Sequence, residues 1–221
     1  MKLFNYDTKK AFDYENGFYL TSDIKRTGKF LAHYRLYLQI MNLPGHIVEC
    51  GVFKGASFLR FATFRNLFES THSRKIIGFD AFGKFPKQEN LEDDKYAREH
   101  DKSSGMGISD SELKKVLQFK NITNFELIKG DINKTVPIYV NNNPQLKIAM
   151  LHIDVDVYEP TMTILKNLYD KVIPSGLIVL DDYSTVFGET RAVDEFFAGK
   201  KIKMSKFTFS HIPVYFRKTE Y

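Results

Sequence analysis

The sequence predicts an α/β fold with a doubly wound, mostly parallel seven-stranded sheet and an antiparallel C-terminal edge strand. Short apolar runs typical of buried strands alternate with stretches of helical period from residue 46 to about residue 199, and parallel neighbours need crossover helices of this kind. The tail, 204–219, contains two β-rich pieces only a few residues apart, which favours an antiparallel pair. At 221 residues the chain can bury the core of one such domain.

The region before the first strand is predicted to form an arm and a helix. Residues 1–25 mix aromatic and charged side chains with little period, so we expect an arm that packs on the body or on a second subunit. Apolar side chains then recur at helical spacing from residue 26 to about residue 42, and Leu43-Pro44-Gly45 ends that helix.

The core is predicted to alternate strands and helices in a regular order. Apolar runs that end in acidic or glycine-containing segments indicate strands, and helical period or a capping pattern indicates helices. In chain order, we expect strands at 46–50, 75–80, 124–131, 146–154 and 176–182, and helices at 56–69, 109–119, 135–142, 159–172 and 189–199. The whole chain, 1–221, is therefore expected to be a single domain made of an N-terminal part, 1–44, and a core, 45–221.

One long polar segment interrupts this alternation. Residues 84–108 follow the second strand and close on Ser103-Ser104-Gly105-Met106-Gly107. Long loops in compact domains are usually functional or disordered. We expect this segment to form a lid above the strand ends.

Four carboxylates follow two neighbouring strands at the points where the apolar runs end. Asp154 and Asp156 follow one run, and Asp181 and Asp182 follow the next. In an open α/β sheet such strand ends face the ligand crevice, where crowded negative charges repel one another unless a cation compensates them. If each strand ends at about its first aspartate, the following side chains can swing inward. An all-oxygen site of this kind suits Mg²⁺ or Mn²⁺.

The first strand-to-helix turn has the features of a nucleoside cofactor site. Gly51 and Gly55 would let the backbone approach a ligand closely, and Glu49 could accept hydrogen bonds from an amine. Asp80 ends the second strand, where an acid commonly binds ribose hydroxyls, and Asp131 follows the third strand. S-adenosylmethionine, with an ammonium, a ribose and an adenine in that order, matches these acids.

Five segments together carry a resemblance to a known family: HIVECGVFKGAS, FDAFGKFP, KGDINKTVP, LHIDVDVYEPTMTILKNLY and SGLIVLDDYSTVFGETRAVDEFF. They resemble the macrocin O-methyltransferases, metal-dependent sugar O-methyltransferases of macrolide and aminocoumarin biosynthesis, over roughly residues 45–200. The resemblance implies a Rossmann-like class I methyltransferase fold, S-adenosylmethionine and Mg²⁺. By motif it implies metal ligands at Asp154, Asp181 and Asp182, a base at Asp156, and cofactor contacts at Glu49, Gly51, Ser57, Asp80 and Asp131. We also expect Gly55, in the same turn, and Asp154 to contact the cofactor.

These features predict an S-adenosylmethionine-dependent, Mg²⁺-dependent O-methyltransferase acting on a hydroxyl of a sugar or glycosylated small molecule. His211, near the C-terminal β pair, is an alternative base because imidazole titrates close to neutral pH. Two other functions stay open. Asp154-Val155-Asp156 could be the metal-binding motif of a nucleotide-sugar glycosyltransferase, or the chain could bind its cofactor without catalysis.

Composition limits the partners that we expect. The net charge is +5, but basic residues are scattered among acidic ones, so the concentrated patch typical of nucleic-acid binding is missing. No apolar run approaches the roughly 20 residues needed to span a bilayer, and MKLFNYDTKK does not resemble a secretory signal. We therefore expect a cytoplasmic protein that contacts neither nucleic acid nor membrane. The aromatic arm favours a homodimer.

Overall fold

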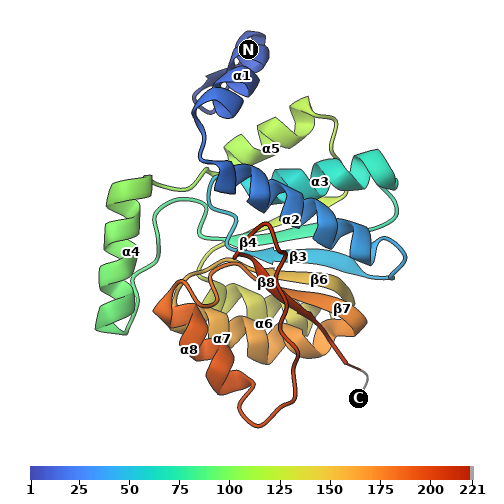
Figure 1. The fold of residues 1–221 in the computed structure, drawn as a ribbon, viewed down its shortest axis with the longest axis vertical. Coiled ribbons are helices and arrows are strands. Elements are labelled where there is room, and N and C mark those ends of the chain that lie inside the picture. The colour runs from blue at the N-terminus through green and yellow to red at the C-terminus, as the bar shows by residue number, and fades with distance from the viewer. Residues whose placement is uncertain (220–221) are drawn as a thin grey trace.

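The computed structural model describes residues 1–219 and has three layers, with a mixed six-stranded sheet between two layers of helices (Figure 1). Its strands are β3 (His46–Cys50), β4 (Ile76–Asp80), β5 (Phe125–Lys129), β6 (Ile148–Ile153), β7 (Val172–Leu180) and β8 (Val214–Arg217). They lie in the order β5-β4-β3-β6-β7-β8, and within this sheet only β7 and β8 pair antiparallel. The predicted fold class is confirmed, including the antiparallel C-terminal edge.

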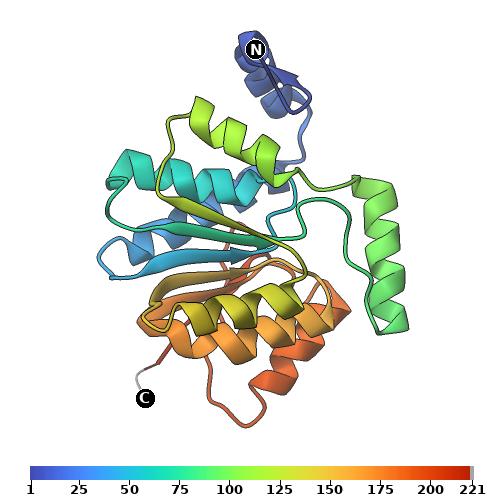
Figure 2. The ribbon, with the colours of Figure 1, turned by 180° about the vertical axis from the view of Figure 1, so that it is seen from behind.

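Helices cover both faces of the sheet (Figures 1 and 2). One face carries α2 (Ile24–Ile40), α3 (Ala56–Phe68) and α5 (Asp110–Phe119), and the other carries α6 (Ile132–Asn142), α7 (Tyr158–Leu168), which η2 (Tyr169–Lys171) extends, and α8 (Phe187–Phe196). Two buried hydrophobic clusters fill the two layers. The central strand β6 is buried along its whole length, as expected for a parallel strand with helices on both sides. Along the described chain, no helix combines the length and apolar character needed to cross a bilayer.

The tail contributes one strand fewer than predicted, so the sheet has six strands where seven were expected. Ser205 forms a single antiparallel bridge with Tyr215, with both N–H···O distances at 2.8 Å. The chain then turns, and the amide of Ser210 donates to the carbonyl oxygen of Phe207 at 3.2 Å. The first β-rich piece is therefore too short to form a second strand.

The segment 84–108 contains a helix, α4 (Leu91–Ser104), that stands beside the sheet (Figure 1). Its polar sequence has no apolar period, which is why helical spacing did not reveal it. Local signals do mark both ends. The side chain of Asn90 accepts a hydrogen bond from the amide of Glu92 at 2.8 Å, and Gly105 follows with a φ of 73°.

The N-terminal arm has more regular structure than its sequence indicated. A two-stranded hairpin, β1 (Lys2–Leu3) and β2 (Tyr6–Asp7), precedes η1 (Thr8–Lys10) and α1 (Ala11–Thr21). Neither η1 nor α1 has a buried residue, and α1 projects away from the layered body (Figure 1).

The strand order reverses between β3 and β6, which makes the carboxyl ends of these strands the topological switch point of the sheet. Gly51 follows β3 with a φ of 92°, and the amide of Asp154, directly after β6, donates to the carbonyl oxygen of Cys50 at 2.9 Å. A Cβ atom at residue 51 would lie 1.7 Å from the carbonyl oxygen of Asp154. Only glycine allows these two chain segments to approach so closely.

Replacing Gly51 with alanine should lower the free energy of unfolding by at least about 3 kcal/mol, because the backbone must move and the φ is strained. Chemical denaturation measures this change. Gly17→Ala is the matched control, since no atom lies within 4 Å of its added Cβ, and helix propensity favours alanine there. Equal stabilities for Gly51→Ala and the parent chain would contradict the close approach.

Candidate active site

A cavity of about 460 Å³ lies at the carboxyl ends of the strands, at the switch point. This volume is within the range of small-molecule sites. The structure brings most of the sequence-predicted site residues to its wall: Gly51, Ser57, Asp80, Asp131, Asp154, Asp156, Asp181 and Asp182.

Three of the predicted residues do not line this cavity. Glu49 is fully buried, and its carboxylate accepts a hydrogen bond from the hydroxyl of Ser57. Gly55 is the residue before α3 and has a φ of 81°. His211 is exposed, on a loop whose Phe209 carbonyl packs beside Gly28 of α2. Glu49 therefore reaches the cavity only through Ser57, and His211 does not reach it.

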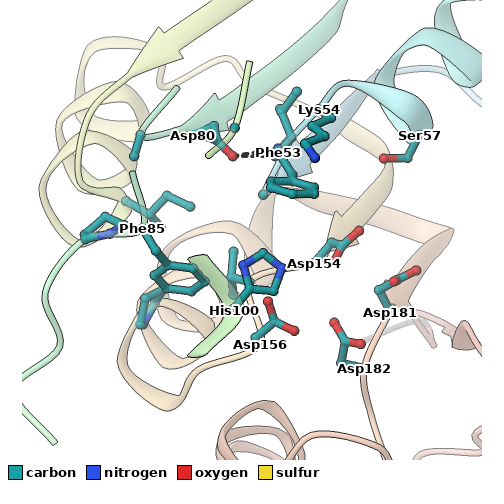
Figure 3. A pocket seen from close by; sticks show the side chains of 18 of the residues that line it. Phe53, Lys54, Ser57, Asp80, Phe85, His100, Asp154, Asp156, Asp181 and Asp182 are labelled. Atoms are coloured by element: carbon teal, nitrogen blue, oxygen red, sulfur yellow. Dashed lines mark hydrogen bonds between the residues drawn. The ribbon is translucent and has the colours of Figure 1, made fainter. Parts of the chain in front are cut away.

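The four aspartates meet on one side of the pocket, with Asp80 apart from them (Figure 3). β6 ends at Ile153 and β7 at Leu180, so the expectation that both strands end near their first aspartate is confirmed. Asp156 has a φ of 63°, a left-handed conformation that is uncommon outside glycine. This backbone turn is part of what places its side chain among the others.

The ligand atoms of three aspartates are close enough to share an ion. Carboxylate oxygens of Asp154, Asp181 and Asp182 all lie within 4.8 Å of one another. Burial, followed by the charges of Asp154 and its neighbours, raises the pKa of Asp182 to about 11, and burial with the charge of Asp181 raises the pKa of Asp154. Both shifts express the cost of gathering these charges without a cation. The all-oxygen set fits Mg²⁺ or Mn²⁺.

Two basic groups that sequence reasoning did not place already offset part of this charge. The ammonium of Lys29, on α2, forms an ion pair with Asp181. The fully buried ring of His152 lies with Nε2 3.5 Å from Asp181 and Nδ1 3.7 Å from Glu49. Burial alone would lower the pKa of His152, but these two carboxylates raise it to about 10. The imidazole is therefore protonated at neutral pH.

The same cations decide the charge of Asp181. Burial alone would raise the pKa of this carboxyl, yet its contact with His152 and the charge of Lys29 hold the pKa below its usual range. Asp181 is thus ionised. Glu189 of α8 behaves differently: it is fully buried, and its Oε1 accepts a hydrogen bond from the amide of Asp182 at 3.1 Å. Burial and the charge of Asp181 raise the pKa of Glu189.

The helix α4 supplies the wall opposite the sheet. The hydroxyl of Tyr96 donates to Asp156 Oδ1 at 2.9 Å, and Asp93 accepts a hydrogen bond from the amide of Tyr158 at 3.0 Å, at the start of α7. The ring of His100 lies 5.1 Å from that of Phe53, centroid to centroid. The part of the chain expected to form a lid therefore faces the acid cluster with aromatic side chains.

The acids on the other side of the cavity also shape the loops around them. Asp80 accepts hydrogen bonds from the amides of Val52 at 2.8 Å and Phe53 at 2.9 Å. Asp131 caps α6 by accepting from the amide of Asn133 at 3.0 Å. Each carboxylate has about four acceptor positions, so both keep capacity for ligand hydroxyls. Together with the positive-φ glycine turn, this wall fits an adenosyl group.

An open α/β sheet with its cavity at the switch point, a glycine turn after the first strand and acids after the next two defines a Rossmann-like methyltransferase. The family described as Macrocin-O-methyltransferase (TylF) matches residues 33–218. The chain belongs to this family and is an S-adenosylmethionine-dependent O-methyltransferase.

Individual relatives agree with this assignment. The chain is 27% identical to demethyldecarbamoylnovobiocin O-methyltransferase of Streptomyces niveus over 80% of its own length and 68% of the relative's. It is 23% identical to 8-demethyl-8-(2,3-dimethoxy-alpha-L-rhamnosyl)-tetracenomycin-C 4′-O-methyltransferase of Streptomyces olivaceus over 64% of its length, and it spans about half, 54%, of that relative. The apo structure of CalS11, a TDP-rhamnose 3′-O-methyltransferase of calicheamicin biosynthesis, superposes with a TM-score of 0.69 at 25% identity, covering 96% of this chain and 86% of CalS11. All three are methyltransferases, which leaves the glycosyltransferase alternative unsupported.

Without a metal, the free energy of unfolding should fall as the pH rises from about 6.5 to about 9, by roughly 2.7 kcal/mol per pH unit, or about 1.4 for each of two protons. The pKa values of Asp182, about 11, and His152, about 10, both lie above their ordinary values, so the native state keeps protons that the unfolded chain has lost. Denaturation in chelator at several pH values measures the slope. Asp182→Asn should reduce the slope to about half, because His152 still contributes, and the exposed Asp170→Asn should leave it unchanged. An unchanged slope in Asp182→Asn would refute the assignment.

Proposed function

We propose that this chain transfers a methyl group from S-adenosylmethionine to a hydroxyl of a sugar or glycosylated small molecule in a divalent-cation-dependent reaction. The observation that carries this proposal is the meeting of three strand-end carboxylates, Asp154, Asp181 and Asp182, beside the glycine turn at the switch point. A natural-product glycoside or an activated sugar is the acceptor class that the relatives suggest. One of them is named for a rhamnosyl-tetracenomycin and another for TDP-rhamnose.

The metal would be held by Asp154, Asp181 and Asp182. Their carboxylate oxygens lie within 4.8 Å of one another at the cavity. The raised pKa values of Asp154 and Asp182 indicate that the negative charge of this cluster is only partly offset. A bound Mg²⁺ or Mn²⁺ would lower the pKa of an acceptor hydroxyl and orient it. Lys29 and His152 would hold Asp181 ionised and in place.

We assign the role of general base to Asp156. Its carboxylate lines the cavity next to the metal-ligand set but is not part of it, and Tyr96 orients it through the 2.9 Å hydrogen bond. Burial raises the pKa of Asp156, which brings it closer to the value at which a carboxylate is an effective base. His211, the alternative base, is exposed and outside the cavity.

We further propose that α4 acts as the lid over the acceptor. The hydrogen bond from Tyr96 to Asp156 and the one from the Tyr158 amide to Asp93 join this helix to the far wall of the cavity. Phe53, Phe85 and His100 line the cavity at the same place, and their rings are in contact, with centroid distances of 5.1 and 5.9 Å from His100. Such a wall can exclude water and pack against a sugar or an aglycone.

The arm supports a homodimer, as its sequence indicated. Large apolar side chains on and next to α1 are exposed, with Phe12 at 74%, Tyr19 at 68% and Leu20 at 84%. Single exposed apolar residues are common, but several on one projecting helix are typical of an interaction surface. We propose that a second copy of this chain covers these exposed side chains of α1. We also propose that the enzyme works in the cytoplasm.

Asp182→Asn should weaken Mn²⁺ binding at least about tenfold, because it removes one carboxylate ligand. Calorimetric titration with Mn²⁺ measures the affinity, and titration with S-adenosylhomocysteine should give the same affinity for variant and parent. Asp194→Asn, an exposed change on α8, is the control and should bind Mn²⁺ as the parent does. Parent-like Mn²⁺ binding by Asp182→Asn would remove this residue from the metal site.

Asp156→Asn should lower kcat for methyl transfer by about 100-fold or more while changing KM little, because the variant can bind the acceptor but cannot accept its proton. Transfer of a labelled methyl group to TDP-rhamnose and to rhamnosyl glycosides measures both constants. His211→Gln is the matched test of the alternative base and should stay within about twofold of the parent. A large loss in His211→Gln with a small one in Asp156→Asn would reverse the assignment.

A further inference from the structure

One wall of the cavity is basic, and two of its side chains, Arg26 and Arg60, have no role in the proposed methyl transfer. Arg26 and Lys29 lie three residues apart on α2, and Ser57 and Arg60 lie three residues apart on α3, so each pair occupies one face of its helix. All four side chains line the cavity. The acids that follow β6 and β7 line the same cavity, and Asp181 meets this wall through its ion pair with Lys29.

Arg60 stands out because it is half-buried and charged but has no acidic partner. Its Nη1 lies 3.4 Å from Nδ1 of His33, and its guanidinium carbon lies 5.6 Å from the ring centroid of Phe30. Within residues 1–219 it forms no ion pair, whereas the neighbouring Lys29 is paired with Asp181. A guanidinium has five donors in a planar fork, so most of its hydrogen-bonding capacity remains for a ligand.

The surroundings of Arg60 contain charges of both signs. Burial and the nearby charge of Arg26 lower the pKa of Arg60, and they outweigh the opposing effect of Asp181 and Glu49. Burial with the charge of His152 keeps His33 neutral by lowering its pKa well below the usual value. The guanidinium stays protonated, and because neither carboxylate forms an ion pair with it, its donors are available to an anion of the ligand.

We propose that Arg60 binds the carboxylate of the aminoacyl end of S-adenosylmethionine. This inference rests on the use of that cofactor by the site described above. A planar guanidinium suits a carboxylate because two parallel N–H···O bonds can form. Arg26, exposed at the same rim of the cavity, adds long-range attraction for the same group.

The neighbouring Ser57 completes the match to an amino acid group. Its hydroxyl donates to the buried Glu49, so the oxygen of Ser57 faces the cavity as an acceptor. An ammonium needs acceptors, and a carboxylate needs donors. Residues one turn apart on a helix have Cβ atoms about 5–6 Å apart, which suits the two charged groups of one zwitterion. Ser57 therefore takes the ammonium and Arg60 the carboxylate.

The position along the sheet edge agrees with this orientation. Asp131 follows β5 and Asp80 ends β4, at the outer part of the cavity, and Gly51 follows the central strand β3. A ribose and adenine near the two acids leave the aminoacyl end to lie towards α2 and α3. In that orientation the sulfonium lies between the two ends, on the side where Asp154 follows β6.

Calorimetry with a matched pair of ligands tests the proposal on the full chain. The first ligand is S-adenosylhomocysteine, and the second is 5′-(3-aminopropylthio)-5′-deoxyadenosine, which differs only in lacking the carboxylate. Arg60→Gln should weaken binding of the first by about 10- to 100-fold and change binding of the second by less than about twofold. Arg60→Lys should recover part of the loss, because it restores the charge without the planar fork.

Lys54→Gln is the control for a general loss of positive charge, since Lys54 also lines the cavity but bonds to the carbonyl of Ser104. It should affect both ligands equally. An equal loss of both ligands in Arg60→Gln would show a structural role and overturn the proposal. So would unchanged binding of both with a raised KM for TDP-rhamnose, which would place an acceptor phosphate at Arg60. Failure of the parent chain to bind S-adenosylhomocysteine at all would instead count against the cofactor site itself.

Discussion

Repulsion among the carboxylates at the ends of β6 and β7 is the constraint on which the site depends. The fold brings Asp154, Asp181 and Asp182 within 4.8 Å of one another in a partly dry cavity, where such charges are costly. Lys29 from α2 and a protonated His152 from β6 offset part of that charge. In the proposed mechanism this residual imbalance would attract a cation, and burial raises the pKa of Asp156, the proposed base.

The polar groups around the cavity, which we propose to contact the cofactor, also hold the local fold in place. Asp80 holds the glycine turn through the amides of Val52 and Phe53, and Asp131 caps α6. Glu49 lies under Ser57 and orients its hydroxyl. Because these acids position the backbone and each other's neighbours, replacing them would disturb the fold as well as any contact with the cofactor, and loss of activity alone would not identify such a contact.

The residues that sequence analysis placed well are those fixed by strand topology. A carboxylate directly after a buried parallel strand must lie at the cavity edge, and this rule was enough to place Asp80, Asp154 and Asp181. Helix-borne groups were missed because the face that a helix turns to the cavity is set by tertiary packing. Lys29, Arg60 and Tyr96 are examples: each comes from a segment far from the acid motifs. His211 was misplaced for the same reason, since proximity to a β pair in sequence says little about how the connecting loop packs.

The ion pair between Lys29 and Asp181 has a consequence for how the enzyme would handle its metal. The ammonium of Lys29 is part of α2 and, unlike a bound ion, cannot dissociate from the protein. A metal ion that binds at this site must therefore share the carboxylate of Asp181 with it. With part of its negative charge already offset by Lys29, the cluster would bind a divalent ion less tightly than three unpaired carboxylates would. Exchange of that ion would then be fast, and the occupancy of the enzyme would follow the free magnesium of its surroundings instead of being fixed when the chain folds.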